Sequence, residues 1–143
     1  MSGDLRMIFH GAVLVVLGLL SGFATAVVPA PNMALAAHTI GIIEGTLCIA
    51  VAFVWPILQA HGYQLTKTRY ALLIGFYCNW LGAILAGVWS AKMMAIVSAA
   101  EMPDIAAHWQ ELVVAVLLNA SILVVFAFVY LGYLTFKLSK RET

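Results

Sequence analysis

Apolar residues dominate four long stretches of the chain, and short polar segments separate them. The stretches cover residues 7–28, 34–58, 70–91 and 110–135. Each is long enough to cross a hydrocarbon core of about 30 Å as an α-helix. The pattern therefore predicts an all-α integral membrane protein, a four-helix bundle that forms one domain over residues 1–143.

The positive charges predict how this bundle is oriented. With four spans, the two termini and the central connection lie on one side of the membrane. That side carries all but one of the basic residues, namely Arg6, Lys67, Arg69, Lys137, Lys140 and Arg141, whereas Lys92 alone lies on the other. Because basic residues stay on the cytoplasmic side, we expect both termini in the cytoplasm and a multi-pass location in the cell inner membrane.

Composition agrees with a membrane protein. Hydrophobic residues make up 64% of the chain and charged residues 9%, whereas about 25% of a soluble domain is charged. The net charge is +1 and no basic patch is present, so we expect the lipid bilayer, and no nucleic acid, as a partner. Cys48 and Cys78 both fall in apolar stretches, and we interpret them as packing residues.

The second stretch contains two ionisable residues, His38 and Glu44. Such groups are costly inside a membrane, usually face the bundle interior and are functional candidates. Gly41 and Gly45 lie beside them, four residues apart. That spacing removes side chains from one helix face, so another helix or a flat ligand can approach there.

His38 has two interpretations. Its imidazole donates a hydrogen bond to a backbone carbonyl of a neighbouring helix, or it is an axial ligand of haem iron, which a neutral imidazole suits. The chain has no Cys-x-x-Cys-His motif, so any haem is expected to be non-covalent. Lys92 either extends to the membrane surface from a helix end or pairs with haem propionates.

Glu44 lies near the middle of the membrane, where a carboxyl group must be protonated, paired or next to a polar cavity. It either forms an interhelical hydrogen bond or transfers a proton during a reaction. Asn79 and Asn119 lie at comparable depth on two other helices, which suggests a shared pocket. Tyr77 and Trp80 either line this pocket and hold an aromatic substrate or serve packing.

Several short motifs resemble the hydroxylaminobenzene mutase family, which is related to the styrene oxide isomerases. They are Asn32–His38 with Gly41 and Gly45, the pair Trp55-Pro56, the run Asn79–Trp89 and the run Trp109–Leu112. Together they extend over most of the chain.

The resemblance implies a small membrane isomerase that assembles as a homotrimer and binds haem b between protomers. His38 would be the axial iron ligand, with Gly41, Gly45 and Lys92 at the haem. Ferric iron would act as a Lewis acid on the oxygen of a small aromatic substrate. The reaction would convert an aryl hydroxylamine to an aminophenol, or an aryl epoxide to an aldehyde.

We expect Glu44, Asn79 and Tyr77 to be catalytic, and the chain departs from the family pattern at Glu44 and at the isomerase tyrosine. Relatives tend to carry asparagine where Glu44 stands, and Ala83 falls near the position of an isomerase tyrosine, for which Tyr77 is a nearby substitute. Two other functions therefore remain open. One is a haem protein of electron transfer with His108 as second axial ligand. The other is a cofactor-free transporter that uses Glu44.

Overall fold

The structure, a computed structural model, describes residues 3–95 and 98–141. Within them, all regular secondary structure is helical, and turns and loops connect the helices. Its elements are α1 (Leu5–Ala24), α2 (Pro31–Ala60), α3 (Thr66–Trp89), the 3-10 turn η1 (Ala99–Glu101), α4 (His108–Ala120) and α5 (Ile122–Ser139). By length and hydropathy, α1, α2, α3 and the α4–α5 pair can each cross a membrane. The predicted all-α bundle of four membrane-length spans is thereby confirmed.

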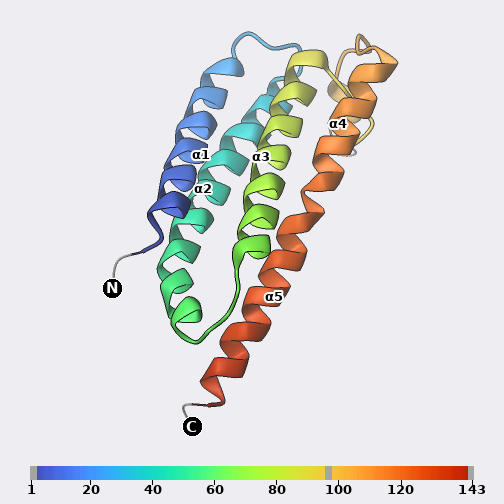
Figure 1. The fold of residues 1–143 in the computed structure, drawn as a ribbon. Coiled ribbons are helices and arrows are strands. Elements are labelled where there is room, and N and C mark those ends of the chain that lie inside the picture. The colour runs from blue at the N-terminus through green and yellow to red at the C-terminus, as the bar shows by residue number, and fades with distance from the viewer. Residues whose placement is uncertain (1–2, 96–97, 142–143) are drawn as a thin grey trace.

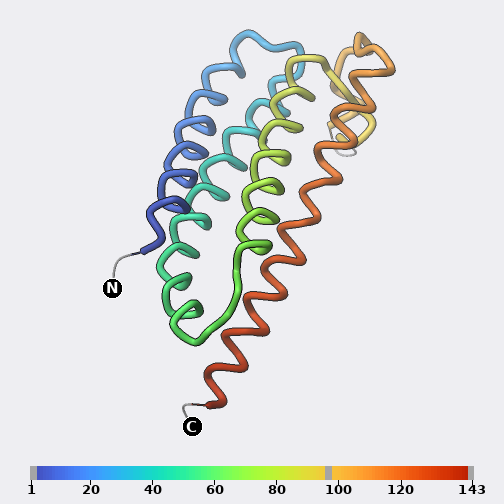
Figure 2. The backbone as a smooth tube through the Cα atoms, viewed as in Figure 1, coloured from blue at the N-terminus to red at the C-terminus, as the bar shows by residue number. Residues whose placement is uncertain are grey.

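The spans run antiparallel to their neighbours in sequence (Figure 1). Helices α1, α2 and α3 form a closely packed group, and α4 and α5 pack on α3. Both ends of the described chain lie at the same end of the bundle as the α2–α3 turn (Figure 2). That end is called the N-terminal face below, and its cytoplasmic location remains a prediction.

All four helical spans differ by a few residues from the ranges expected from hydropathy, and the first and last differ in form as well. The first was expected to reach residue 28, but α1 ends at Ala24 and a hydrogen-bonded turn follows it. The last span is divided at Ser121. The hydroxyl group of Ser121 donates to the carbonyl oxygen of Leu118 over 2.6 Å, a local bond that competes with the regular helical pattern.

Glycine residues bring α1 and α2 into backbone contact. A Cβ atom at Gly41 would lie 2.5 Å from the Cα atom of Gly18, and one at Gly45 would lie 2.6 Å from the carbonyl oxygen of Gly11. Neither contact leaves room for a side chain. The small residues of both helices therefore set their close crossing.

An ion pair at the N-terminal face joins the first three helices. Asp4 caps α1 by accepting hydrogen bonds from the backbone N–H groups of Arg6 and Met7. The same carboxylate pairs with Arg69 of α3. The guanidinium group of Arg69 lies 5.4 Å from the ring centroid of the buried Trp55 on α2.

The opposite end of the bundle is closed by the connection between α3 and α4. Both carboxylate oxygens of Glu111 accept backbone hydrogen bonds, from Lys92 and Met93, each at 2.7 Å. Ser90 ends α3 in the left-handed conformation, with φ of 57°, and its hydroxyl group donates to the carbonyl oxygen of Pro103. These bonds fix the connection to the end of α3 and the start of α4.

Candidate functional site

The imidazole of His38 projects from α2 against α1. Its Nδ1 atom lies 2.9 Å from the carbonyl oxygen of Gly18. Because a carbonyl oxygen only accepts, Nδ1 carries the proton, and Nε2 of the neutral ring keeps its lone pair. Gly22 provides the space, since a Cβ atom there would lie 2.9 Å from Nδ1.

This hydrogen bond fits the chemistry of a metal ligand. Histidines that bind a metal through one nitrogen usually donate the other N–H to a carbonyl or carboxylate group. His38 is partly exposed, and the carbonyl hydrogen bond and an axial role are therefore compatible. Among the described residues, no three His, Cys, Asp or Glu side chains lie together as a metal site. Haem brings its own four nitrogen ligands, so one axial histidine from the protein suffices.

Gly41 and Gly45 have a different neighbour from the one expected for haem-binding residues. Both are buried under the backbone of α1, next to Gly18 and Gly11 respectively. A flat macrocycle at this glycine face would have to displace α1. The sequence predicted either a helix or a flat ligand against this glycine face, and in the structure the neighbour is the helix α1.

Glu44 and Asn79 are brought together between α2 and α3. The Asn79 side-chain amide donates to Oε1 of Glu44 over 2.7 Å. Glu44 is 8% exposed, and its Oε2 atom is buried with no hydrogen-bond partner among the described residues. The pair therefore has one satisfied carboxyl oxygen and one that can still take or give a proton.

Asn119 does not join this pair, although the sequence placed it at a similar depth. It is exposed on α4, and its amide donates to the carbonyl oxygen of Ala115 in the same helix at 2.7 Å. The expectation of three polar groups in one pocket is therefore wrong for this residue. Depth along a helix does not determine which face a side chain occupies.

Tyr77 contacts a residue that sequence analysis did not select. Its hydroxyl group lies 3.1 Å from Nδ1 of His10 on α1, and the two rings meet edge to face. Trp80 donates in the same way from α3 to α1, with its indole N–H 3.0 Å from the hydroxyl oxygen of Ser21. His10 and Ser21 are eleven residues apart, about three helical turns, and this spacing was the available sign of a shared face.

A buried thiol also lies at the contact of α2 with α1. Cys48 follows Glu44 by one turn of α2, and its Sγ atom lies 3.3 Å from the carbonyl oxygen of Met7. The group of α1, α2 and α3 thus encloses a set of polar residues, namely His10, Tyr77, Cys48, Glu44 and Asn79.

Lys92 and His108 lie at the end of the bundle nearer to His38. The ammonium group of Lys92 is 3.6 Å from the exposed carboxylate of Asp104. His108 is exposed at the first position of α4, which packs on α3. The imidazole of His38 instead faces α1, so the two histidines face different neighbours.

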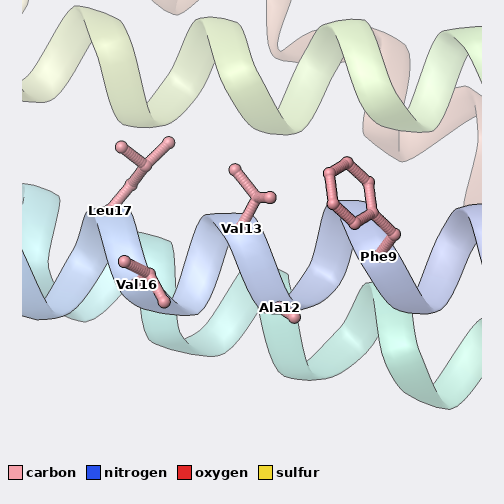
Figure 3. A pocket seen from close by; sticks show the side chains of 5 residues that line it. All are labelled: Phe9, Ala12, Val13, Val16 and Leu17. Atoms are coloured by element: carbon pink, nitrogen blue, oxygen red, sulfur yellow. The ribbon is translucent and has the colours of Figure 1, made fainter.

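An apolar groove of about 250 Å³ runs along α1. Its lining residues are Phe9, Ala12, Val13, Val16 and Leu17. Figure 3 shows Phe9, Val13 and Leu17 on the side of α1 that faces α3. No polar side chain lines this groove, so it can accommodate a hydrocarbon or aromatic group without directing chemistry.

Comparison with known proteins relates the whole chain to membrane isomerases. A family model described as styrene oxide isomerase matches residues 4–136. Hydroxylaminobenzene mutase HabA of Ectopseudomonas oleovorans is 38% identical over 81 residues, which span 57% of this chain and 60% of HabA. Hydroxylaminobenzene mutase HabB of the same organism is 32% identical over 130 residues, which span 89% of this chain and 79% of HabB. No solved structure matches the chain.

Proposed function

Because this chain belongs to the styrene oxide isomerase family, we propose that it is a haem-dependent membrane isomerase of a small aromatic substrate. An aryl hydroxylamine is the preferred substrate, since both curated relatives are named as hydroxylaminobenzene mutases. An aryl epoxide is the other candidate. Neither reaction involves net oxidation or reduction.

The observation that carries the proposal is the hydrogen bond from Nδ1 of His38 to the carbonyl oxygen of Gly18. It fixes the tautomer that leaves Nε2 available to iron and orients the ring. His38 would hold haem b, and Lys92 would supply a cation for a propionate group. A bound ferric haem supplies a Lewis acid that polarises the N–O or C–O bond of the substrate.

Glu44 and Asn79 would then carry out the proton transfer that the reaction requires. In the conversion of an aryl hydroxylamine to an aminophenol, the N–O bond breaks and a ring C–O bond forms. One proton leaves the ring carbon and one is gained by nitrogen, so the composition is unchanged. Oε2 of Glu44 lacks a partner and can give or accept that proton, while Asn79 holds Oε1 and thereby orients the carboxyl group.

Tyr77 would be a second polar group beside the substrate, held by His10. The apolar surroundings of these residues suit the ring of an aromatic substrate. We further propose a homotrimer in the cell inner membrane with both termini in the cytoplasm. The excess of basic residues at the N-terminal face supports this orientation.

The decisive measurement is the absorption spectrum of the detergent-purified protein, compared with His38→Ala. Haem bound through His38 gives a Soret band at about 400–420 nm, which should be absent in His38→Ala. His61→Ala is the matched control, because His61 is an exposed histidine at the end of the same helix. Hydroxylaminobenzene and styrene oxide are then supplied separately, and the isomeric products are quantified.

The outcomes separate the competing functions. A five-coordinate spectrum with isomerised product supports the proposal. A six-coordinate spectrum that changes in His108→Ala indicates electron transfer instead. If the protein has no Soret band even when haem is supplied during expression, the haem-dependent reaction is refuted and Glu44-dependent transport becomes the leading hypothesis.

A further inference from the structure

Two further grooves lie between α2 and α5. The first, about 200 Å³, is lined by residues that include Val51, Phe128 and Gly132. The second, about 220 Å³, continues toward the N-terminal face and shares Val54 and Thr135 with the first. The grooves exist because α5 packs on α3 and leaves its side toward α2 without close helix contact.

The walls of this α2–α5 groove are almost entirely apolar. The hydroxyl group of Thr135 donates back to the carbonyl oxygens of Leu131 and Gly132 in its own helix, so it offers no unsatisfied polar atom to the groove. A Cβ atom at Gly132 would have no neighbour within 4 Å. This wall is therefore open and matches a hydrocarbon chain in polarity.

The indole ring of Trp55 lies beneath the apolar surface of the first groove. Trp55 lines the first groove, is fully buried, and its indole N–H has no acceptor among the described residues. A buried N–H group without an acceptor is costly. The N–H group is not accessible from the groove, so the accessible surface of the groove stays apolar.

Positive charge accumulates where the groove ends. Leu138 and Ser139 line the last part of the groove, and the segment 137–143 contains three basic residues and one acidic residue. The ammonium group of Lys140 lies 4.7 Å from the ring centroid of Phe136. Basic residues next to a membrane surface attract anionic headgroups.

We propose that the α2–α5 groove binds one acyl chain of an anionic phospholipid, whose headgroup contacts the basic end of α5. The apolar groove binds the chain, and Lys137 and Arg141 select the charge. This inference stands apart from the isomerase reaction, since the groove and the His38 imidazole occupy different sides of α2.

Native mass spectrometry of the detergent-released protein tests the proposal with phosphatidylglycerol and phosphatidylcholine of identical chains. The intact protein should retain phosphatidylglycerol preferentially. Gly132→Leu, which adds a side chain in open space, should lose both lipids. Lys137→Gln with Arg141→Gln should reduce phosphatidylglycerol retention by about fivefold for each charge removed and leave phosphatidylcholine unchanged.

Ala12→Leu is the matched control, because it adds the same side chain to the α1 groove and should leave lipid retention unchanged. Equal retention of the two lipids by the intact protein would overturn the proposal. So would unchanged lipid retention in Gly132→Leu. If Gly132→Leu instead lowers the oligomeric mass, the groove is filled by a second copy of the chain, and the lipid proposal is wrong.

Discussion

The imidazole of His38 lies directly over Gly22, where a Cβ atom would come within 2.9 Å of Nδ1. This contact joins α2 to α1 one turn beyond the carbonyl group of Gly18 that accepts the imidazole proton. The position of the proposed iron ligand thus depends on a missing side chain in another helix.

The first prediction concerns Gly22→Ala. The added methyl group should push the imidazole away from Gly18 and lower the haem content of the purified protein, because ligand orientation is lost while the fold is kept. The ratio of Soret to protein absorbance measures this effect. Gly132→Ala adds a methyl group to a helical glycine with open space around it, and its haem content should match that of the unmodified protein. Equal haem content in Gly22→Ala would contradict the assigned role of Gly22.

The second prediction concerns Glu44→Gln. The glutamine carbonyl can still accept the Asn79 amide hydrogen bond, so the melting temperature should change little. The side-chain amide cannot give up a proton at neutral pH, and turnover of hydroxylaminobenzene should fall by about 100-fold or more, as expected for loss of a general acid–base group. Full turnover with intact haem would show that the proton moves by another route.

The third prediction concerns the crossing of α1 and α2. Gly41→Val places a branched side chain against the backbone of Gly18 and should destabilise the bundle by about 1–3 kcal/mol, the usual cost of overpacking. Thermal unfolding in detergent measures the effect. Gly132→Val is the comparison, and an equal loss of stability in both variants would mean that helix propensity, rather than the crossing, is responsible.

Gly41 and Gly45 illustrate how much of the fold and of the site could be predicted from the sequence. Hydropathy located four spans because the bilayer requires about 20 apolar residues in each. The spacing of Gly41 and Gly45 also showed a face prepared for close approach. It did not distinguish a helix from a flat ligand as the occupant, because that depends on how the neighbouring helix is placed.

The polar residues show the same limit. The rise per residue placed Glu44 and Asn79 at one depth, and the structure brings them together. The same reasoning failed for Asn119, which faces outward, and it did not select His10, which contacts Tyr77. Rotation of each helix about its own axis is fixed by packing that a single sequence does not display.

The fourth prediction concerns the bond between His10 and Tyr77. His10→Phe and Tyr77→Phe should each lower stability, and the double variant should reveal a coupling of about 0.6 kcal/mol, typical of interhelical hydrogen bonds in membranes. Turnover separates the two residues: if Tyr77 contacts the substrate, Tyr77→Phe lowers kcat more than His10→Phe does. Additive stability losses would show that the hydrogen bond contributes nothing in the membrane.

The fifth prediction concerns the ion pair of Asp4 and Arg69. Asp4→Asn retains a side chain that can cap α1 but leaves the partly buried guanidinium group of Arg69 without its carboxylate partner, so it should cost about 1–3 kcal/mol, and less at high salt. Asp4→Ala removes the cap as well and should cost about 1 kcal/mol more. Unfolding at two salt concentrations checks both values. Identical stability of the two variants would refute the capping role.

The glycine contacts between α1 and α2 also bear on how the protein is made. Every group that holds the His38 ring, from Gly18 to Gly22, precedes Ala60, where α2 ends. The hairpin of α1 and α2 leaves the ribosome before α3 is complete, and neighbouring membrane helices associate once both have been inserted. The iron-binding half of the proposed site can therefore form during synthesis, whereas the Glu44–Asn79 pair must wait for the third helix.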